Sequence, residues 1–369
     1  MENGNTLVTL GVRGTLFEVN PEGEVVWKYI NPVIGDGPLN QGDEIPENSN
    51  GKSNENKVFK THRYNSSFPG FVGKDLTPGD YVEFWTDDCS DEESIPWDSD
   101  GDGCIDDSDG DGVGDNVDIC SGFDDNIDID GDGIPDGCDS LIEGGTEPIC
   151  NANRNGTWTV GLIYCDDRAD EDYTLFAPMS SASTYLIDTH GRMVHSWTSS
   201  SNLRPGLSAY MLEDGDLLRT ANIGTDGGGS FSGGGIAGKI ERLSWDSQME
   251  WEWFYVGDSR RSHHDIEPLP NGNFLMIAWE AKSVEQSEQA GRDPDKMSQN
   301  QLWPDHIIEV EPSGSDQGTV VWEWHIWDHL IQDFDSTKDN YGVVADHPEL
   351  LDINFADASG PNKYKSDWM

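Results

Sequence analysis

Basic residues are scarce in this chain of 369 residues, which has 22 Lys and Arg, 71 Asp and Glu, and a formal net charge of −49. No Lys or Arg occurs between Asp75 and Asn153. Such a surface repels nucleic acid and anionic membranes, so neither is an expected partner. Long apolar runs are also lacking, and those present are too short to span a bilayer.

Helical periodicity is nearly absent from the sequence. Apolar and polar residues instead alternate with a period of two, as in Ile308–Ser313 and Val320–His325. This alternation, interrupted by turns that contain glycine, predicts antiparallel hairpins. The chain is therefore expected to be all-β.

Aspartate is abundant and regularly spaced in the middle of the chain. Three windows of 12 residues carry Asp at positions 1, 3, 5, 9 and 12, and Gly at position 6 (Gly103, Gly112 and Gly133). Carboxylates at this spacing, with a glycine at the sharp turn, suit Ca²⁺. The predicted calcium ligands are Asp98, Asp100, Asp102, Asp106, Asp107, Asp109, Asp111, Asp115, Asp118, Asp128, Asp130, Asp132, Asp136 and Asp139.

The alternative for this acidic stretch is a solvated linker, the usual form of a block of like charges. A linker has no reason to repeat ligand spacing three times with its glycines in register. Proline, glycine and Asp-Asn pairs flank the loops in place of amphipathic runs, which argues against a helix-loop-helix site. The stretch resembles the thrombospondin type 3 repeat, and this resemblance implies ions that share Asp107 and Asp109 between neighbouring loops.

All six cysteines lie in or close to the acidic stretch, at Cys89, Cys104, Cys120, Cys138, Cys150 and Cys165. An even number of cysteines in a segment with little apolar core indicates disulfides formed in an oxidising compartment. Of the fifteen pairings that six cysteines allow, we expect sequential neighbours to pair, which joins Cys89 to Cys104, Cys120 to Cys138 and Cys150 to Cys165. Zinc is less favoured because no Cys-x-x-Cys pair occurs.

Calcium loops and disulfides indicate an extracellular, periplasmic or cell-surface location, yet the sequence shows no signal peptide. Residues after Met1 already have a strand pattern. We therefore expect the chain to be a fragment of a longer secreted protein.

A two-part repeat surrounds the acidic stretch. Its first half is a turn followed by apolar residues, as in Asn3–Leu7, Asp214–Leu218 and Asn271–Leu275. Its second half is a hairpin whose last strand ends in tryptophan, and it occurs at 16–27, 185–197, 240–253 and 307–324. Four-stranded units of this kind predict the blades of a partial β-propeller on either side of an irregular calcium-bound segment. A β-sandwich with similar hairpins is the alternative.

The run from Thr159 to Trp368, which includes Arg204-Pro-Gly-Leu and His263-His264-Asp265, resembles the first half of an arylsulfotransferase-family propeller. Residues 3–82, with Phe17 to Trp27, are similar to the closing blade of that family. The resemblance implies three domains: a closing blade at 1–86, calcium-binding repeats at 87–150, and the N-terminal part of a second propeller at 151–369.

The same resemblance implies that a sulfuryl group passes from a phenolic sulfate ester to a phenol through a sulfated histidine. It gives His264, with His263 beside it, a place in the channel as an electrostatic or hydrogen-bonding stabiliser, and Asp265 could fix the tautomer of His264. The attacking histidine of the family is expected after Met369. The histidines at 306, 325, 329 and 347 could bind a metal, but we expect them to be ordinary blade residues near tryptophans.

Two classes of function are expected from these features. The first is a secreted arylsulfotransferase that acts on aryl sulfates and phenols, with further blades supplied by the parent chain. The second is a non-catalytic extracellular binding module or scaffold, made rigid by calcium.

Overall fold

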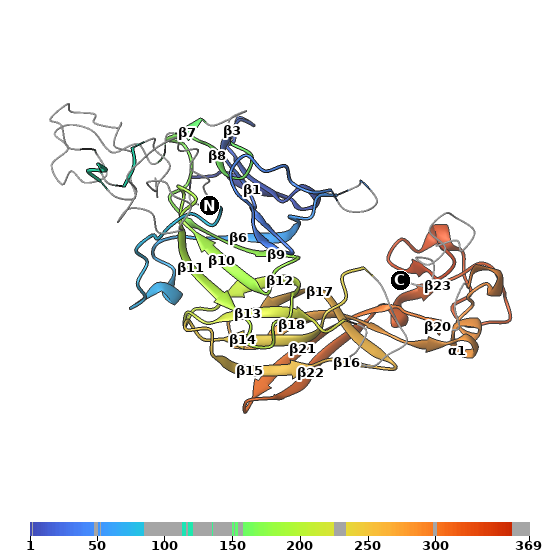
Figure 1. The fold of residues 1–369 in the computed structure, drawn as a ribbon. Helices are drawn as coiled ribbons and strands as arrows, with labels where there is room; N and C mark the ends of the chain where they lie inside the picture. The colour runs from blue at the N-terminus through green and yellow to red at the C-terminus, as the bar shows by residue number, and fades with distance from the viewer. Residues whose placement is uncertain are drawn as a thin grey trace. The chain divides into compact units, whose positions relative to one another are not determined.

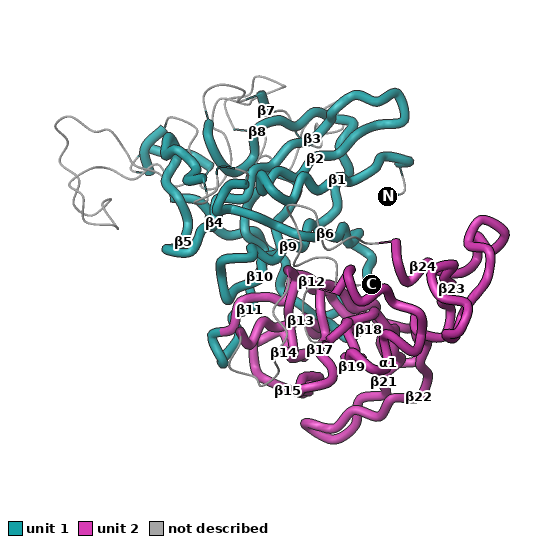
Figure 2. The backbone as a smooth tube through the Cα atoms, turned by 90° about the vertical axis from the view of Figure 1, so that its right-hand side faces the viewer, with its two compact units in different colours: residues 1–202, 213–215 teal, residues 203–212, 216–369 magenta. Residues whose placement is uncertain are grey.

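The computed structural model describes residues 1, 3–47, 51, 53–84, 113–115, 117–120, 135, 150, 152–153, 158–224, 234–297 and 301–355. Most regular structure in these ranges is β-strand, and the four large sheets are antiparallel, so the prediction of an all-β chain is confirmed (Figure 1). The chain divides into two compact units, 1–202 with 213–215, and 203–212 with 216–369 (Figure 2).

Unit 1 contains two large sheets. The first sheet has the order β1-β2-β3-β8-β7, formed by Thr6–Leu10, Thr15–Val19, Val25–Ile30, Gly161–Cys165 and Ala152–Asn153. The second sheet has the order β6-β9-β10-β11, formed by Val58–Tyr64, Tyr173–Pro178, Ser183–Ile187 and Met193–Thr198. The short strands β4 (Val33–Ile34) and β5 (Gly37–Pro38) pair with each other, and the 3₁₀ turns are η1 (Gly11–Arg13) and η2 (Pro69–Phe71).

Unit 2 contains the third sheet, β12-β13-β14-β15, formed by Pro205–Met211, Leu217–Asn222, Gly238–Leu243 and Met249–Phe254. The fourth sheet has the order β16-β17-β18-β21-β22, formed by Val256–Gly257, Arg260–Pro268, Phe274–Glu280, Asp305–Ser313 and Gln317–His325. The remaining elements are β19 (Lys282–Ser283), α1 (Val284–Gln289), η3 (Pro294–Lys296), β20 (Gln301–Leu302), η4 (Ile326–His329), β23 (Leu330–Ile331), η5 (Val344–Asp346) and β24 (Leu351–Asp352).

All four predicted tryptophan hairpins are present, as the pairs β2-β3, β10-β11, β14-β15 and β21-β22. The turn half of the repeat is tied to the hairpin that follows it. In the first sheet Asn3 and Asn5 both donate side-chain hydrogen bonds to the carboxylate of Glu18. The fourth sheet repeats this arrangement, because Asn271 and Asn273 donate to Oε1 of Glu309 at 3.1 and 2.6 Å.

The third sheet keeps the same contact with donor and acceptor exchanged. There the turn carries Asp216 in place of asparagine, and the facing strand carries Arg242 in place of glutamate. Nε of Arg242 donates to Oδ2 of Asp216 at 2.7 Å. Because one partner changes with the other, the repeat is a structural unit and not only a similarity of letters.

Strands from both sides of residues 87–150 share the two sheets of unit 1. β3 pairs with β8, with Trp27 opposite Cys165, and β6 pairs with β9. The acidic stretch therefore begins and ends within one compact unit. The domain boundaries at residues 86 and 150 stay a prediction.

Each unit has its own apolar core between its two sheets. In unit 1, Trp27 and Tyr29 of β3 pack against Phe176 and Ile187 of the second sheet. In unit 2, Trp251 of β15 packs against Phe274 of the fourth sheet, with their ring centroids 5.9 Å apart. The predicted tryptophan strands thus supply the largest side chains of both cores.

Candidate functional site

The His263-His264-Asp265 sequence lies in β17 where the strand departs from regular pairing. β17 pairs with β18 up to Ser262 opposite Ala278, and regular pairing resumes at Ile266 opposite Met276. Within this irregular stretch His264 has a φ of 51°, in the left-handed region. Such a backbone conformation is costly for a histidine and is typical of functional sites.

The two imidazoles are joined in a chain of polar contacts. Nδ1 of His263 lies 2.8 Å from Nδ1 of His264, and Nε2 of His263 lies 3.2 Å from Oδ1 of Asp305. The second contact is within ion-pair distance, although its alignment is poorer than that of a hydrogen bond. The His263 ring also stacks on Trp279, with centroids 3.8 Å apart.

These polar contacts determine which ring nitrogens of His263 and His264 carry a proton. The carboxylate of Asp305 favours a proton on Nε2 of His263, which leaves Nδ1 of that ring as an acceptor. His264 then donates from Nδ1 and carries its lone pair on Nε2. Burial lowers the pKa of His264 below its ordinary value, and the neighbouring His263 lowers it further. At neutral pH His264 is therefore a neutral imidazole.

Gly235 sets the position of the His264 ring. The backbone N–H of His264 donates to the carbonyl of Gly235 at 2.8 Å. Gly235 has a φ of +81°, and a Cβ at this residue would lie 2.3 Å from Cε1 and Nε2 of His264. Only glycine allows the ring to lie this close to the backbone.

Asp265 points its carboxylate toward Tyr210 of β12. The Tyr210 hydroxyl lies 3.0 Å from Oδ1 of Asp265 and 3.1 Å from Oε2 of Glu267. Burial and these two carboxylates raise the pKa of Tyr210 well above its ordinary value, so the phenol stays protonated. The carboxylate that acts on the tautomer of His264, through His263, is that of Asp305.

Arg261, two residues before His263, is a buried cation, and the described residues give it no anionic partner. Only 1% of its surface is exposed. Its Nη2 donates to the carbonyls of Gly224 and Ala237, while Nε and Nη1 have no hydrogen-bond partner among the described residues. Burial lowers the pKa of Arg261, and no described carboxylate opposes this effect. Two unpaired nitrogens of a buried guanidinium are costly unless an anion binds them.

The remaining histidines of unit 2 have the ordinary surroundings that the sequence favoured. Nε2 of His306 lies 2.9 Å from the Tyr255 hydroxyl, and Nδ1 of His325 lies 3.0 Å from Oε1 of Glu280. His329 stacks on Trp324, and His347 contacts Glu349. Within the described ranges no three His, Cys, Asp or Glu side chains form a group that could hold a metal ion.

Of the fourteen predicted calcium ligands, only Asp115 and Asp118 belong to the described residues. Oδ1 of Asp118 accepts the backbone N–H of Cys120 at 2.7 Å. The twelve others lie outside the described residues, namely Asp98, Asp100, Asp102, Asp106, Asp107, Asp109, Asp111, Asp128, Asp130, Asp132, Asp136 and Asp139. Calcium binding at these windows stays a prediction.

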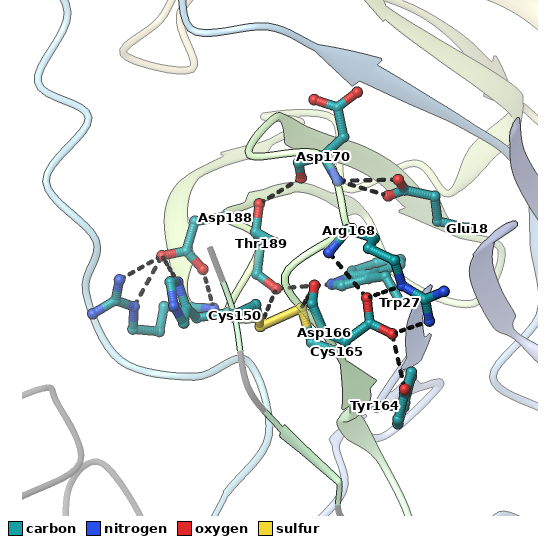
Figure 3. The surroundings of a disulfide bond; sticks show 12 residues. Glu18, Trp27, Cys150, Tyr164, Cys165, Asp166, Arg168, Asp170, Asp188 and Thr189 are labelled. Atoms are coloured by element: carbon teal, nitrogen blue, oxygen red, sulfur yellow. Dashed lines mark hydrogen bonds and ion pairs between the residues drawn. A yellow bond between two sulfur atoms is a disulfide. The ribbon is translucent and has the colours of Figure 1, made fainter. Parts of the chain in front are cut away.

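The predicted disulfide between Cys150 and Cys165 is present, with a Cα–Cα distance of 5.5 Å (Figure 3). It lies beside the Trp27 indole, whose Nε1 donates to the carbonyl of Thr189 at 2.8 Å. The disulfide therefore fixes the end of the acidic stretch to the core of unit 1. Cys120 is also disulfide-bonded. The predicted pairs Cys89 with Cys104 and Cys120 with Cys138 stay predictions, because Cys89, Cys104 and Cys138 lie outside the described residues.

Sequence reasoning found His263 and His264 but missed Arg261, Asp305 and Gly235. Arg261 carried a usable signal, because a basic residue beside a histidine pair is rare in a chain with so few basic residues. Asp305 lies 42 positions after His263, and Gly235 lies in a glycine-rich segment; neither had a local signal.

A scan against models of protein families finds no match to this sequence, and a search of curated proteins finds none either. No helix within the described ranges is both long enough and apolar enough to cross a bilayer.

Proposed function

We propose that the segment around Arg261, His263 and His264 binds the sulfate group of an aryl sulfate ester, as part of an arylsulfotransferase-like β-propeller outside the cell. The observation that carries the proposal is a buried guanidinium with two nitrogens that the described residues leave unpaired, three positions from a neutral imidazole. A sulfate ester is a compact anion whose oxygens match the planar donors of arginine.

The propeller part of the proposal rests on the repeat. The second, third and fourth sheets share one chain order of four antiparallel strands, β6-β9-β10-β11, β12-β13-β14-β15 and β17-β18-β21-β22. In each, the last strand of the four carries a tryptophan from the repeat. Such units pack side by side around a channel in propellers.

The chemistry proposed for this site is a two-step transfer. In the first step a histidine nitrogen bonds to sulfur, the sulfur–oxygen bond to the donor phenol breaks, and the phenolate leaves. In the second step the oxygen of the acceptor phenol bonds to sulfur and the nitrogen–sulfur bond breaks. His264 is not the attacking residue in this proposal. Its Nε2 lone pair takes the proton of the acceptor phenol, while Arg261 holds the sulfuryl oxygens.

Anion binding tests the proposal directly. Titration calorimetry with inorganic sulfate and with an aryl sulfate should show binding to the wild-type chain. Arg261→Met should weaken it by roughly 10-fold or more, the effect of losing a charged hydrogen bond. Arg260→Met is the matched control, since this neighbouring guanidinium lies over the Tyr255 ring, 4.5 Å from its centroid. Equal affinities of the two variants, or no binding by the wild type, would refute the site.

A non-catalytic binding module is the second candidate. The contacts of four other histidines favour it, because their rings already bond to or stack on neighbouring side chains. These histidines are His306, His325, His329 and His347. Transfer from an aryl sulfate to a phenol separates the two candidates when it is measured on a protein that carries the attacking histidine. Binding without turnover by that protein supports the module, whereas turnover that falls in its His264→Ala variant supports the proposed role of His264 in the transfer.

The proposal includes Ca²⁺ at the three aspartate windows, supported by their spacing. The expected dissociation constants are on the order of 10⁻⁴ to 10⁻³ M, as for extracellular modules. Asp109→Ala should remove more bound calcium than Asp98→Ala, because Asp109 belongs to two windows and Asp98 to one. Equilibrium dialysis with millimolar Ca²⁺ measures this difference, and a chain that binds no calcium would contradict the assignment.

A further inference from the structure

Three repeat hairpins carry a tryptophan at the same position of their last strand, but these three tryptophans have different surroundings. Trp27 pairs with Glu18 in register, Trp251 with Arg242, and Trp322 with Glu309. These three facing residues are the ones that contact the Asn or Asp turn in each repeat. The register therefore makes the three tryptophans structural equivalents.

Two of these equivalents are covered by the next sheet of their own unit. Trp27 is 0% exposed, and its Nε1 donates to Thr189 O in the hairpin of the second sheet. Trp251 is 4% exposed, and its Nε1 donates to Gln317 O, in the hairpin of the fourth sheet, at 2.9 Å. In both units, then, a tryptophan of one sheet reaches a hairpin carbonyl of the following sheet.

Trp322 and Trp324 of β22, at the end of the fourth sheet (Figure 1), are 48% and 36% exposed. Ile307 and Leu275, on the same side of the fourth sheet, are half-buried, whereas Ile308 and Met276, on its other side, are buried. We call the side formed by Leu275, Ile307, Trp322 and Trp324 the tryptophan face. Glu309, opposite Trp322, lies on this side as well, so the face is mainly apolar, and the described residues leave its two tryptophans exposed.

The first sheet leaves the complementary side exposed. In the second sheet, the side that covers Trp27 and Tyr29 carries Phe176, Thr174 and Ile187, all buried. The pairing register places Val8, Thr6 and Val19 of the first sheet at the positions that Phe176, Thr174 and Ile187 occupy in the second sheet. Phe17 pairs with Val8 on the same side. Val8, Phe17 and Val19 are only half-buried and Thr6 is exposed. We call these four residues the receiving face.

The equivalent hairpin carbonyl is also available in the first sheet. Thr189 follows Asp188 in the turn between β10 and β11, and Pro21 follows Asn20 in the turn between β2 and β3. Asn20 and Asp188 both form the first hydrogen bond of their turn. Pro21 is exposed, and none of the described groups donates to its carbonyl.

From these two faces we infer that the tryptophan face of one chain binds the receiving face of a second copy of the same chain, head to tail. The contact repeats the packing of the first sheet on the second and of the third on the fourth. Trp322 is placed to donate to the carbonyl of Pro21 of the second copy. We choose a second copy of the chain as the binding partner because one chain carries both the tryptophan face and the receiving face. A contact between two different faces forms a ring or an open chain of subunits.

Sedimentation velocity of the full chain from about 1 to about 100 µM tests the inference. The wild type should form assemblies of two or more chains as concentration rises. Trp322→Ser with Trp324→Ser, which removes one face, and Phe17→Asp, which removes the other, should each remain monomeric. Val72→Ser is the matched control, because Val72 is 83% exposed and belongs to neither face.

Mixing the two monomeric variants is the decisive measurement. Each variant keeps one intact face, so the mixture should form a heterodimer that grows no further, which also shows that both variants are folded. A wild type that is monomeric over the whole range would overturn the inference. Assembly of Phe17→Asp as strong as that of the wild type would overturn it too, because the receiving face would then play no part.

Discussion

Arg219 of the third sheet and Arg261 of the fourth are both buried arginines of unit 2, with 0% and 1% of their surface exposed. Nε of Arg219 donates to Oε2 of Glu241 at 2.9 Å, and Lys239 reaches the other oxygen of that carboxylate at 2.8 Å. Among the described residues Arg261 meets only backbone carbonyls, and its Nε and Nη1 have no partner. The buried charge of Arg219 is therefore neutralised by a neighbouring carboxylate, whereas no described carboxylate neutralises that of Arg261.

The difference extends beyond the arginines. In the third sheet the polar atoms of Arg219, Lys239 and Glu241 are all satisfied, and the network joins β13 to β14. In the fourth sheet Nδ1 of His306 also has no partner among the described residues, and His264 has a strained backbone. Buried polar groups that are fully paired stabilise one structure, and unpaired ones mark places where a ligand could supply what is missing. The contrast separates a structural network from a candidate site in the same unit.

The largest expected effect comes from removing each arginine in turn. Arg219→Met leaves the buried Glu241 with only Lys239 and should lower the free energy of unfolding by about 3 to 5 kcal/mol. Arg261→Met removes an unpaired buried charge, so it should change that free energy by less than about 1 kcal/mol or raise it. Urea unfolding of both variants measures the difference. Equal losses would show that Arg261 is a structural residue, like Arg219.

A second effect concerns the dependence of stability on pH. Burial lowers the pKa of His306 from 6.5 to about 4, with a further decrease from His325 and an opposing effect of Glu280. Between about pH 6.5 and 4 the unfolded chain binds a proton at this histidine and the folded chain does not. Stability should therefore fall as pH falls through this window.

His306→Gln removes this contribution. The stability lost between about pH 7.5 and 4.5 should be about 2 kcal/mol larger for the wild type than for the variant. The exposed His347→Gln serves as the control and should behave as the wild type does. Parallel pH profiles for wild type and His306→Gln would contradict the assignment of an unsatisfied neutral imidazole to the fourth sheet.

The smallest expected effect isolates the contact between Gly235 and the His264 ring. Gly235→Ala adds a methyl group in collision with this ring, at a residue with φ of +81°. Gly314→Ala is the matched control, because Gly314 has φ of +60° with nothing within 4 Å of an added Cβ. Both variants should lose roughly 1 kcal/mol to backbone strain.

Only Gly235→Ala should also move the imidazole resonances of His264 in NMR spectra and weaken sulfate binding. If both glycine variants bind sulfate like the wild type, the position of the His264 ring has no role in the site.

The hairpins were predictable from the sequence because their determinants are local. Alternation of apolar and polar residues sets which side of a strand is buried, and turn residues such as Gly4, Gly215 and Gly272 supply the positive φ that the turns require. The pair Cys150 and Cys165 was also predictable, since short separation favours its closure. His263 and His264 were found by their motif, without reference to their surroundings.

The rest depended on register between distant strands. Asp305 meets His263 because β18 lies between β17 and β21 and aligns their ends, and Gly235 meets His264 through a segment outside these strands. Whether Arg261 forms an ion pair could not be predicted from its neighbours in sequence, because ion pairing depends on which carboxylates the fold brings near it. Tertiary structure alone decided that Arg219 has such a partner and that Arg261 has none among the described residues.

The repeat shows the same division most clearly. The sequence by itself predicted hairpins with a tryptophan in the last strand, at 16–27, 185–197, 240–253 and 307–324. The pairing register of the strands then made Trp27, Trp251 and Trp322 equivalent. The sequence did not determine that the first two are buried and the third is half exposed. Burial of a sheet side requires a second sheet packed on it, and that is a property of the neighbours in space and not of the strand itself.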